Sequence, residues 1–160
     1  MQEILAEIWG TVLSEFSDIP DATQATKVIL RLCIASLLGG LIGYERELRG
    51  KSAGLRTHML VALGSALFIL VPQQAGASPA DVSRILQGLI AGIGFLGAGA
   101  IMIGQQKENT TGLTTAATVW ITAAIGITVG IGLEMTAVVS AVLTLIILAC
   151  LPKPTKNDHD

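Results

Sequence analysis

Residues 85–104, ILQGLIAGIGFLGAGAIMIG, form a run of 20 residues without a charged side chain. A helix needs about 20 apolar residues to cross the hydrocarbon core of a bilayer, and so long a run exceeds the usual length of a strand. Within lipid the backbone has no water to bond, so a helix is the structure that satisfies its own polar groups. This stretch therefore predicts a transmembrane helix.

Further apolar runs of similar length lie on both sides of it, which brings the number of predicted spans to five. They cover residues 27–44, 55–71, 85–104, 112–130 and 133–151. The composition agrees, because 51% of the 160 residues are apolar, 14% are charged and the mean hydropathy is +0.67. A soluble domain carries roughly 25% charged residues. We expect an all-α fold, a polytopic membrane bundle of about five transmembrane helices.

The first residues, MQEILAEIWGTVLSEF, predict a short amphipathic helix in front of the spans. Apolar residues recur at helical spacing from Ile4 to Phe16, while the glutamates lie off that stripe. About 14 residues are too few to cross a bilayer, so this helix either lies on the membrane surface or packs on another part of the protein. No cleaved secretory signal is expected, because the start is acidic and the first basic residue is Lys27.

The charged residues gather between the spans, and their distribution predicts an orientation. The loop ERELRGKSAGLR (45–56) holds four basic residues, and others lie at Lys107 and in the tail 153–160. Because cytoplasmic loops are enriched in Lys and Arg, these segments are predicted on the cytoplasmic side and the N-terminus outside. The predicted organisation is an amphipathic segment and turn (1–24), a five-span domain (25–152) and a cytoplasmic tail.

The first charged loop is one candidate site. Its carboxylates, Glu45 and Glu47, point about 200° apart in a continuous helix, so they cannot share one metal ion. Each faces a base at i+4, Arg49 and Lys51 respectively, with the acid first, which favours two ion pairs and membrane anchoring. No metal site is predicted, although a kink at a neighbouring glycine or a second subunit would reopen that alternative.

Three more side chains complete this loop. Arg46 and Arg56 add to its positive charge, and His58 is predicted at the interface, where it either senses pH near neutrality or is merely polar. The sequence contains no candidate cluster of a catalytic acid, base and nucleophile, and no phosphate-binding GxxxxGK[ST] loop. We therefore expect neither an enzyme nor a bound cofactor. The net charge of −2 argues against nucleic-acid binding.

Small residues form a second group of candidates, because helices in lipid associate by close packing of small side chains. Glycines lie four residues apart at Gly39/Gly43, Gly88/Gly92 and Gly126/Gly130. The densest block is residues 92–99, which also holds Gly94, Gly97 and Gly99. A glycine inside a helix costs up to about 1 kcal/mol relative to alanine in water. This density predicts either tight helix contacts or a broken helix that exposes carbonyls to an ion or substrate.

Polar residues inside the spans give further expectations. A stripe of hydroxyls, predicted as a packing seam or a pore lining, consists of Thr111, Thr115, Thr118 and Thr122. Arg31, Arg84 and Glu134 lie near the outer ends of spans and are candidates for pairing with one another. Cys33 and Cys150 have no partner at a metal-ligand spacing and are predicted to be small buried hydrophobes.

Three blocks in order, GGLIGYERELRGKSAGLRTHMLVALGSAL, RILQGLIAGIGFLGAGAIM and GLTTAATVWITAAIGITVGIG, resemble the MgtC/SapB family of bacterial inner-membrane proteins. The resemblance covers about residues 30–151. The family signature falls on Glu45, Arg46, Glu47, Lys51, Arg56 and His58, and on Gly92, Gly94, Gly97 and Gly99. The best-known members continue into a soluble cytoplasmic domain, whereas this sequence reads as a short form ending at Asp160.

This resemblance implies a role in coping with low magnesium and, in intracellular pathogens, in survival inside macrophages. We expect a non-enzymatic modulator that contacts the bilayer, a second copy of itself and other membrane proteins, such as ATP synthase or transporters. The alternative is a transporter or channel for Mg²⁺ or another small solute, acting as an oligomer. A third alternative is a purely structural membrane subunit.

Overall fold

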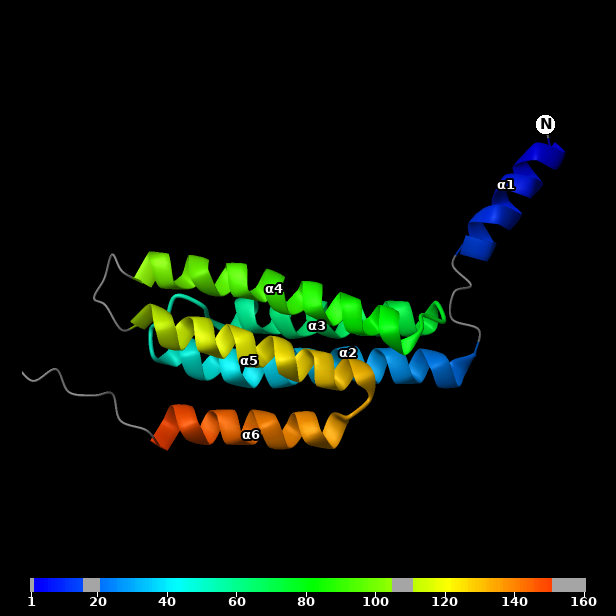
Figure 1. Cartoon of the computed structure of the whole chain (residues 1–160). Helices are drawn as coiled ribbons and strands as arrows, with labels where there is room; N and C mark the ends of the chain where they lie inside the picture. The colour runs from blue at the N-terminus through cyan, green and yellow to red at the C-terminus, as the bar shows by residue number, and fades with distance from the viewer. Residues whose placement is uncertain (1, 16–20, 105–110, 151–160) are drawn as a thin grey trace, which may run out of the picture. The chain divides into compact units, whose positions relative to one another are not determined.

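The computed structural model describes residues 2–15, 21–104 and 111–150, and within them all regular structure is helical. The helices are α1 (Gln2–Glu15), α2 (Ala22–Leu48), α3 (Leu55–Gln74), α4 (Pro79–Gly104), α5 (Thr111–Ile131) and α6 (Glu134–Cys150) (Figure 1). The all-α prediction is therefore confirmed. Lys107 and the tail 153–160 lie outside the described residues.

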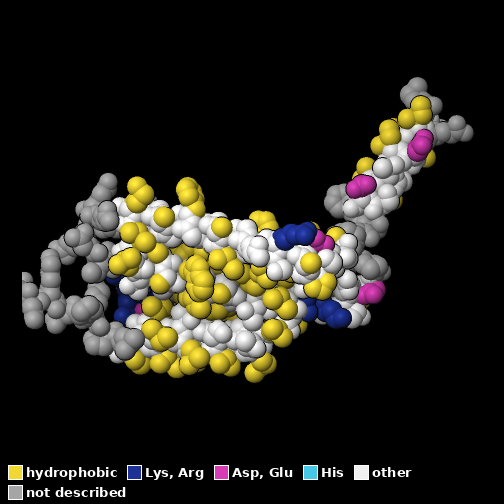
Figure 2. Space-filling view, in the orientation of Figure 1, with side chains coloured by type: hydrophobic (Ala, Val, Ile, Leu, Met, Phe, Trp, Pro, Cys, Tyr) yellow, Lys and Arg dark blue, Asp and Glu magenta, His cyan; other side chains and the backbone are white. Residues whose placement is uncertain are grey.

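The five predicted spans correspond in order to α2 through α6. The first four of these helices are long and apolar enough to cross a membrane. Helix α6 is shorter, with 17 residues, which is at the lower end of the lengths that cross a bilayer. A hydrophobic belt separates charged side chains near the two ends of the bundle on the face seen in Figure 2. The structure is thus a helical membrane bundle.

Helix α4 begins at Pro79, earlier than the predicted start at Ile85. The Ser78 hydroxyl accepts the Asp81 backbone N–H at 3.3 Å and donates to the Asp81 carboxylate at 2.6 Å, so Ser78 caps the first turn and Asp81 orients the capping hydroxyl. Proline at the first helical position lacks only an N–H that would otherwise need capping. The segment between the predicted spans 55–71 and 85–104 is therefore mostly helix.

The chain divides into two compact units, residues 1–30 and 31–160. The first unit contains α1, which confirms the predicted short N-terminal helix. Its apolar side chains are exposed, Trp9 by 65% and Ile4 by 61%. Phe16 lies outside the described residues. That this stripe either lies on a membrane surface or packs on another part of the protein stays a prediction.

The core of the second unit is built around α5, which contacts α3, α4 and α6. Figure 1 shows α5 lying between α4 and α6. The main core cluster also includes one face of α2, and its buried members are Ala35, Leu38, Ile42, Ala62, Ala66, Ile125, Val129, Ala137 and Ala141. Because most of these side chains are small, the helix backbones approach closely.

Two of the predicted glycine pairs lie where helices touch. A Cβ added to Gly126 would overlap the backbone of Ala62, whose Cα would be 2.9 Å away, and one on Gly130 would lie 2.8 Å from the Ala66 carbonyl oxygen. Glycines 39 and 43 make the same kind of contact between α2 and the first turns of α3. Tight helix packing therefore explains these two pairs.

The glycines of α4 behave differently. Within the described residues, no atom lies within 4 Å of a Cβ added to Gly88, Gly92, Gly94 or Gly99, and one on Gly97 would meet Ala116 in an ordinary contact at 3.6 Å. Helix α4 also runs unbroken to Gly104. The predicted break is not present in α4, and the predicted close contact at Gly88/Gly92 does not form among the described residues.

The two cysteines are exposed on the outside of the helices, so the prediction that they are buried was wrong. Apolar side chains of a membrane protein gain as much by facing lipid as by facing another helix. Cys33 and Cys150 can thus point outward from apolar helices.

The basic residue in the first span, Arg31, connects three helices. Its Nε lies 3.2 Å from Oε1 of Glu134, and its Nη1 donates to the Gly130 carbonyl at 3.2 Å. Arg84 instead pairs with Asp81 on its own helix at 3.2 Å. The predicted pairing among these charges is therefore present for Arg31 with Glu134 and absent for Arg84.

We expect Arg31→Gln to lower the free energy of unfolding by about 1 kcal/mol, because it breaks an ion pair that is only partly exposed to solvent. Arg84→Gln is the matched control and should leave stability unchanged, since its ion pair is mostly exposed. Unfolding of the purified protein in mixed micelles, followed by far-ultraviolet circular dichroism, compares the two. Equal losses would contradict a specific role for Arg31.

Candidate functional site

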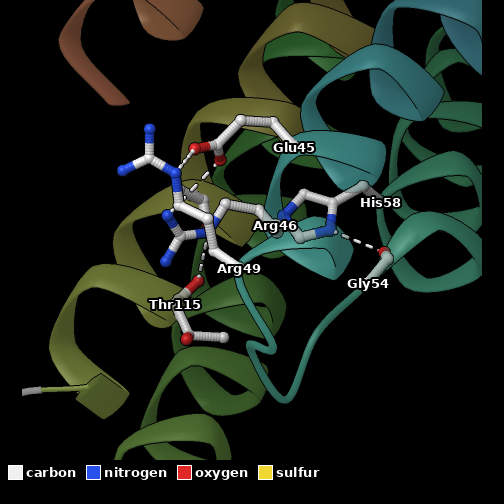
Figure 3. Close-up of polar contacts among 7 residues, drawn as sticks. Glu45, Arg46, Arg49, Gly54, His58 and Thr115 are labelled. Carbon is white, nitrogen blue, oxygen red and sulfur yellow. Dashed lines mark hydrogen bonds and ion pairs between the residues drawn. The ribbon is translucent and has the colours of Figure 1, made fainter. Parts of the chain in front are cut away.

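A cluster of polar side chains lies where the end of α2 meets the first turns of α3 and α5. Figure 3 shows Glu45, Arg46 and Arg49 from α2 and the turn after it, His58 from α3, and Thr115 from α5. Thr115 is far from the other four residues in sequence, and packing of α5 against α2 and α3 brings it to them. Arg46, His58 and Thr115 of this cluster are buried.

Arg46 is at the centre of this cluster and is only 2% exposed. Its Nη1 lies 3.5 Å from Oε2 of Glu45, and the side chain points toward Thr115 (Figure 3). The Nε and Nη2 atoms of this guanidinium have no hydrogen-bond acceptor among the described residues. A buried arginine depends on its counter-ion, so Glu45 holds the charge of Arg46 in place.

Glu45 lies between two arginines. Its second carboxylate oxygen, Oε1, contacts Nε of Arg49, one helical turn further along. The predicted ion pair at i to i+4 is therefore present. Because the carboxylate also approaches Arg46, its negative charge is shared between the two arginines.

Glu47 has a role that the sequence did not predict. Helix α2 ends at Leu48, and Gly50 reverses the chain with a φ of 63°, a left-handed conformation that glycine adopts without strain. The prediction for Glu47 and Lys51 assumed one continuous helix through both residues, and this assumption was wrong. Oε2 of Glu47 accepts the backbone N–H of Leu55 at 2.8 Å and caps the start of α3.

His58 is fully buried, so the prediction of an interfacial histidine was wrong. Its Nδ1 lies 2.9 Å from the carbonyl oxygen of Gly54. A carbonyl only accepts, so we assign the proton to Nδ1, which leaves Nε2 as an acceptor in the neutral ring. Within the described part of the chain, Nε2 has no partner.

The remaining loop residues lie around this cluster. Arg56 is exposed in the first turn of α3, and Lys51 is partly buried in the turn. Burial of Arg46 was missed, although a signal existed: Gly39, Gly43 and Arg46 follow steps of four and three and thus share one helix face. Both glycines on that face contact α3, so the arginine faces the same neighbour.

The threonines of α5 form the predicted stripe inside the bundle. Thr115, Thr118 and Thr122 are buried. The Thr118 hydroxyl donates to the Thr115 carbonyl at 2.8 Å, and the Thr122 hydroxyl donates to the Thr118 carbonyl at 2.7 Å. These bonds stay within the helix, so the stripe is compatible with a packing seam. The side chain of Thr111 lies outside the described residues.

No group of three or more His, Cys, Asp or Glu side chains gathers at one point within residues 2–15, 21–104 and 111–150. Both loop carboxylates are engaged, Glu45 with the two arginines and Glu47 with the α3 backbone.

The apolar helices and the charges at their ends define an integral membrane protein of the polytopic helical class. The MgtC family model matches residues 32–157, and the chain belongs to the MgtC family. No solved structure matches it.

Three relatives show the extent of the similarity. The chain is 45% identical over 132 residues to "Putative magnesium transporter YhiD" of Escherichia coli K12, covering 78% of this chain and 60% of that protein. It is 45% identical over 130 residues to "Protein SrpB" of Synechococcus elongatus, covering 74% and 71%. It is 47% identical over 117 residues to "Protein MgtC" of Salmonella typhimurium, covering 73% and 49%. The match thus spans 49% to 71% of the length of these relatives.

Proposed function

We propose that this chain is a non-enzymatic modulator of membrane transport or energetics under magnesium limitation. It acts in the bacterial inner membrane, with its N-terminus outside and its C-terminus in the cytoplasm. The family resemblance makes membrane machinery such as ATP synthase or transporters the candidate targets. In intracellular pathogens, the same resemblance links this activity to survival in the host.

The engagement of polar groups within the chain supports this proposal. Thr118 and Thr122 bond to their own helix, Glu45 binds two arginines, and Arg31 binds Glu134. A transport pathway would instead present such groups to the solute. By contrast, the outer face of α4 exposes small and apolar residues, which suits contact with other helices.

A transporter or channel for Mg²⁺ or another small solute is the second candidate. One relative carries the name "Putative magnesium transporter YhiD". The exposed glycines of α4 supply the specific observation, because backbone carbonyls beside them become accessible if two copies enclose a path. In that case Gly94 would border the path.

Flux into sealed liposomes separates the two candidates. We expect the purified protein to admit Mg²⁺ and protons no faster than empty liposomes, measured with a dye for each ion inside the vesicles. The same protein should restore magnesium-limited growth to a bacterium that lacks its own family member. Gly94→Leu is the control, since a side chain there meets no other described atom of the chain. Flux that Gly94→Leu abolishes would establish the transporter instead.

A further inference from the structure

A groove lies between α2 and α3 on the outside of the bundle. Its volume is about 420 Å³, and apart from one hydroxyl its lining is apolar: Leu32, Cys33, Ser36, Leu37, Met59 and Leu63. Leu37 is 61% exposed, and Cys33 is exposed as well. Because both helices belong to a membrane bundle, the exposed side of this groove faces lipid.

Helices α2 and α3 stay in contact from the groove to the turn that joins them. A Cβ added to Gly40, one turn beyond Leu37, would lie 3.3 Å from Cγ of Met59. One added to Gly43 would lie 2.7 Å from the Cα of Leu55. The groove therefore leads along the two helices to the turn, where the charged residues begin.

Tyr44 and Arg56 lie at this end of the groove. Tyr44 is seven residues from Leu37 on α2, and Arg56 is seven residues from Leu63 on α3, so each returns to the helix face that lines the groove. Both side chains are exposed. Tyrosine is enriched at the level of lipid headgroups, and the planar guanidinium of arginine binds phosphate with two parallel hydrogen bonds.

The charge of Arg56 is available to an external anion. Among residues 2–15, 21–104 and 111–150, Arg56 has no ion-pair partner. The carboxylates of the turn are engaged elsewhere, Glu45 with two other arginines and Glu47 with the α3 backbone. Arg84 adjoins a second apolar groove, between α3 and α4, but it has its own counter-ion in Asp81.

The length of the groove fits one leaflet of a bilayer. Tyr44 and Cys33 are eleven residues apart on α2, which corresponds to about 16 Å along the helix. The hydrocarbon core is about 30 Å thick, so one leaflet accounts for about 15 Å of it. An acyl chain in the groove thus extends through its leaflet while the phosphate of the same lipid lies at Arg56. A soluble anion would leave the apolar part unused.

We propose that this groove binds an anionic phospholipid, with the phosphate on Arg56 and an acyl chain between α2 and α3. The lipid belongs to the leaflet that surrounds the α2–α3 turn. A zwitterionic lipid binds less well, because the cation of its own headgroup offsets the phosphate charge that Arg56 attracts. The inference does not depend on the proposed modulator function, since a transporter can hold the same lipid.

Native mass spectrometry of the purified full chain, released from micelles that contain phosphatidylglycerol or phosphatidylcholine, tests the headgroup site. We expect the protein to retain phosphatidylglycerol in preference. Arg56→Gln should weaken that binding about tenfold, because it removes charge-assisted hydrogen bonds to the phosphate. Arg84→Gln removes an arginine that has its own carboxylate and should leave binding unchanged. Equal retention of the two lipids, or an unaltered Arg56→Gln variant, would overturn the proposal.

A bulky substitution tests the groove itself. Cys33→Phe fills its deep end from an exposed position and should weaken phosphatidylglycerol binding at least about fourfold, the effect of one methylene group displaced from its contacts. Leu41→Phe is the matched control, since Leu41 is exposed on α2 but does not line the groove. Circular dichroism checks that both variants fold. Equal binding by the two variants would rule out the groove, as would displacement of the lipid by an equal concentration of inorganic phosphate.

Discussion

Replacing Gly126 by alanine is expected to lower the free energy of unfolding by about 3 kcal/mol, the upper end of the usual cost of overpacking. The added methyl group would overlap the Ala62 carbonyl and lie 2.9 Å from its Cα. Backbone atoms cannot rotate away as a flexible side chain can. Helices α3 and α5 would therefore have to separate along the core of the bundle.

Gly64→Ala is the control for this prediction. Gly64 lies inside α3, and no described atom is within 4 Å of an added Cβ. Alanine there should raise the free energy of unfolding by up to about 1 kcal/mol, since it is the better helix former. Denaturation in mixed micelles, followed by circular dichroism, measures both variants. A stabilising Gly126→Ala would show that the two helices do not touch at this point.

The second large effect is expected for Glu45→Gln, which should lower stability by about 3 kcal/mol. The substitution keeps the size of the side chain but leaves the buried guanidinium of Arg46 without a counter-ion. It also removes the ion pair with Arg49. The same denaturation assay measures this loss.

Glu47→Gln makes the same change of charge two residues away and serves as the control. It should cost about 1 kcal/mol, because it weakens only the cap on the exposed N–H of Leu55. Adding Arg46→Met to Glu45→Gln should restore much of the lost stability, since no buried charge then remains unpaired. Equal losses for the two glutamine variants, or no recovery in the double variant, would contradict the central role of Arg46.

The number and order of the helices could be predicted from the sequence, because long apolar runs in a membrane protein leave one choice of backbone structure. The start of α4 could also have been predicted: Ser78, Pro79 and Asp81 carry the pattern of a capped helix. Helix ends in polar segments were harder to predict, since polar residues there are equally compatible with a loop.

The neighbours of each glycine could not be predicted. Gly126/Gly130 and Gly88/Gly92 have the same spacing, yet of these two pairs only the first contacts another helix in the part of the chain that the structure describes. Spacing defines a face, but the order in which helices pack decides what that face meets.

Burial could not be predicted from hydrophobicity either. Cys33 faces outward because lipid accepts it, whereas Arg46 and His58 are buried because α2 and α3 enclose them. In a bilayer, an apolar side chain is equally stable on the outside of the bundle. Which residues are buried in the candidate site could therefore be learned only from the three-dimensional structure.

The bond between Glu47 and the Leu55 backbone joins residues eight apart, whereas Arg31 and Glu134 are 103 residues apart. Contacts between residues close in sequence form early, since little chain entropy is lost in closing a short loop. We expect the hairpin of α2 and α3 to close while the ribosome is still making the rest of the chain. Arg31 then enters the bilayer before its carboxylate has been synthesised, and insertion is complete only when α6 brings Glu134 to it.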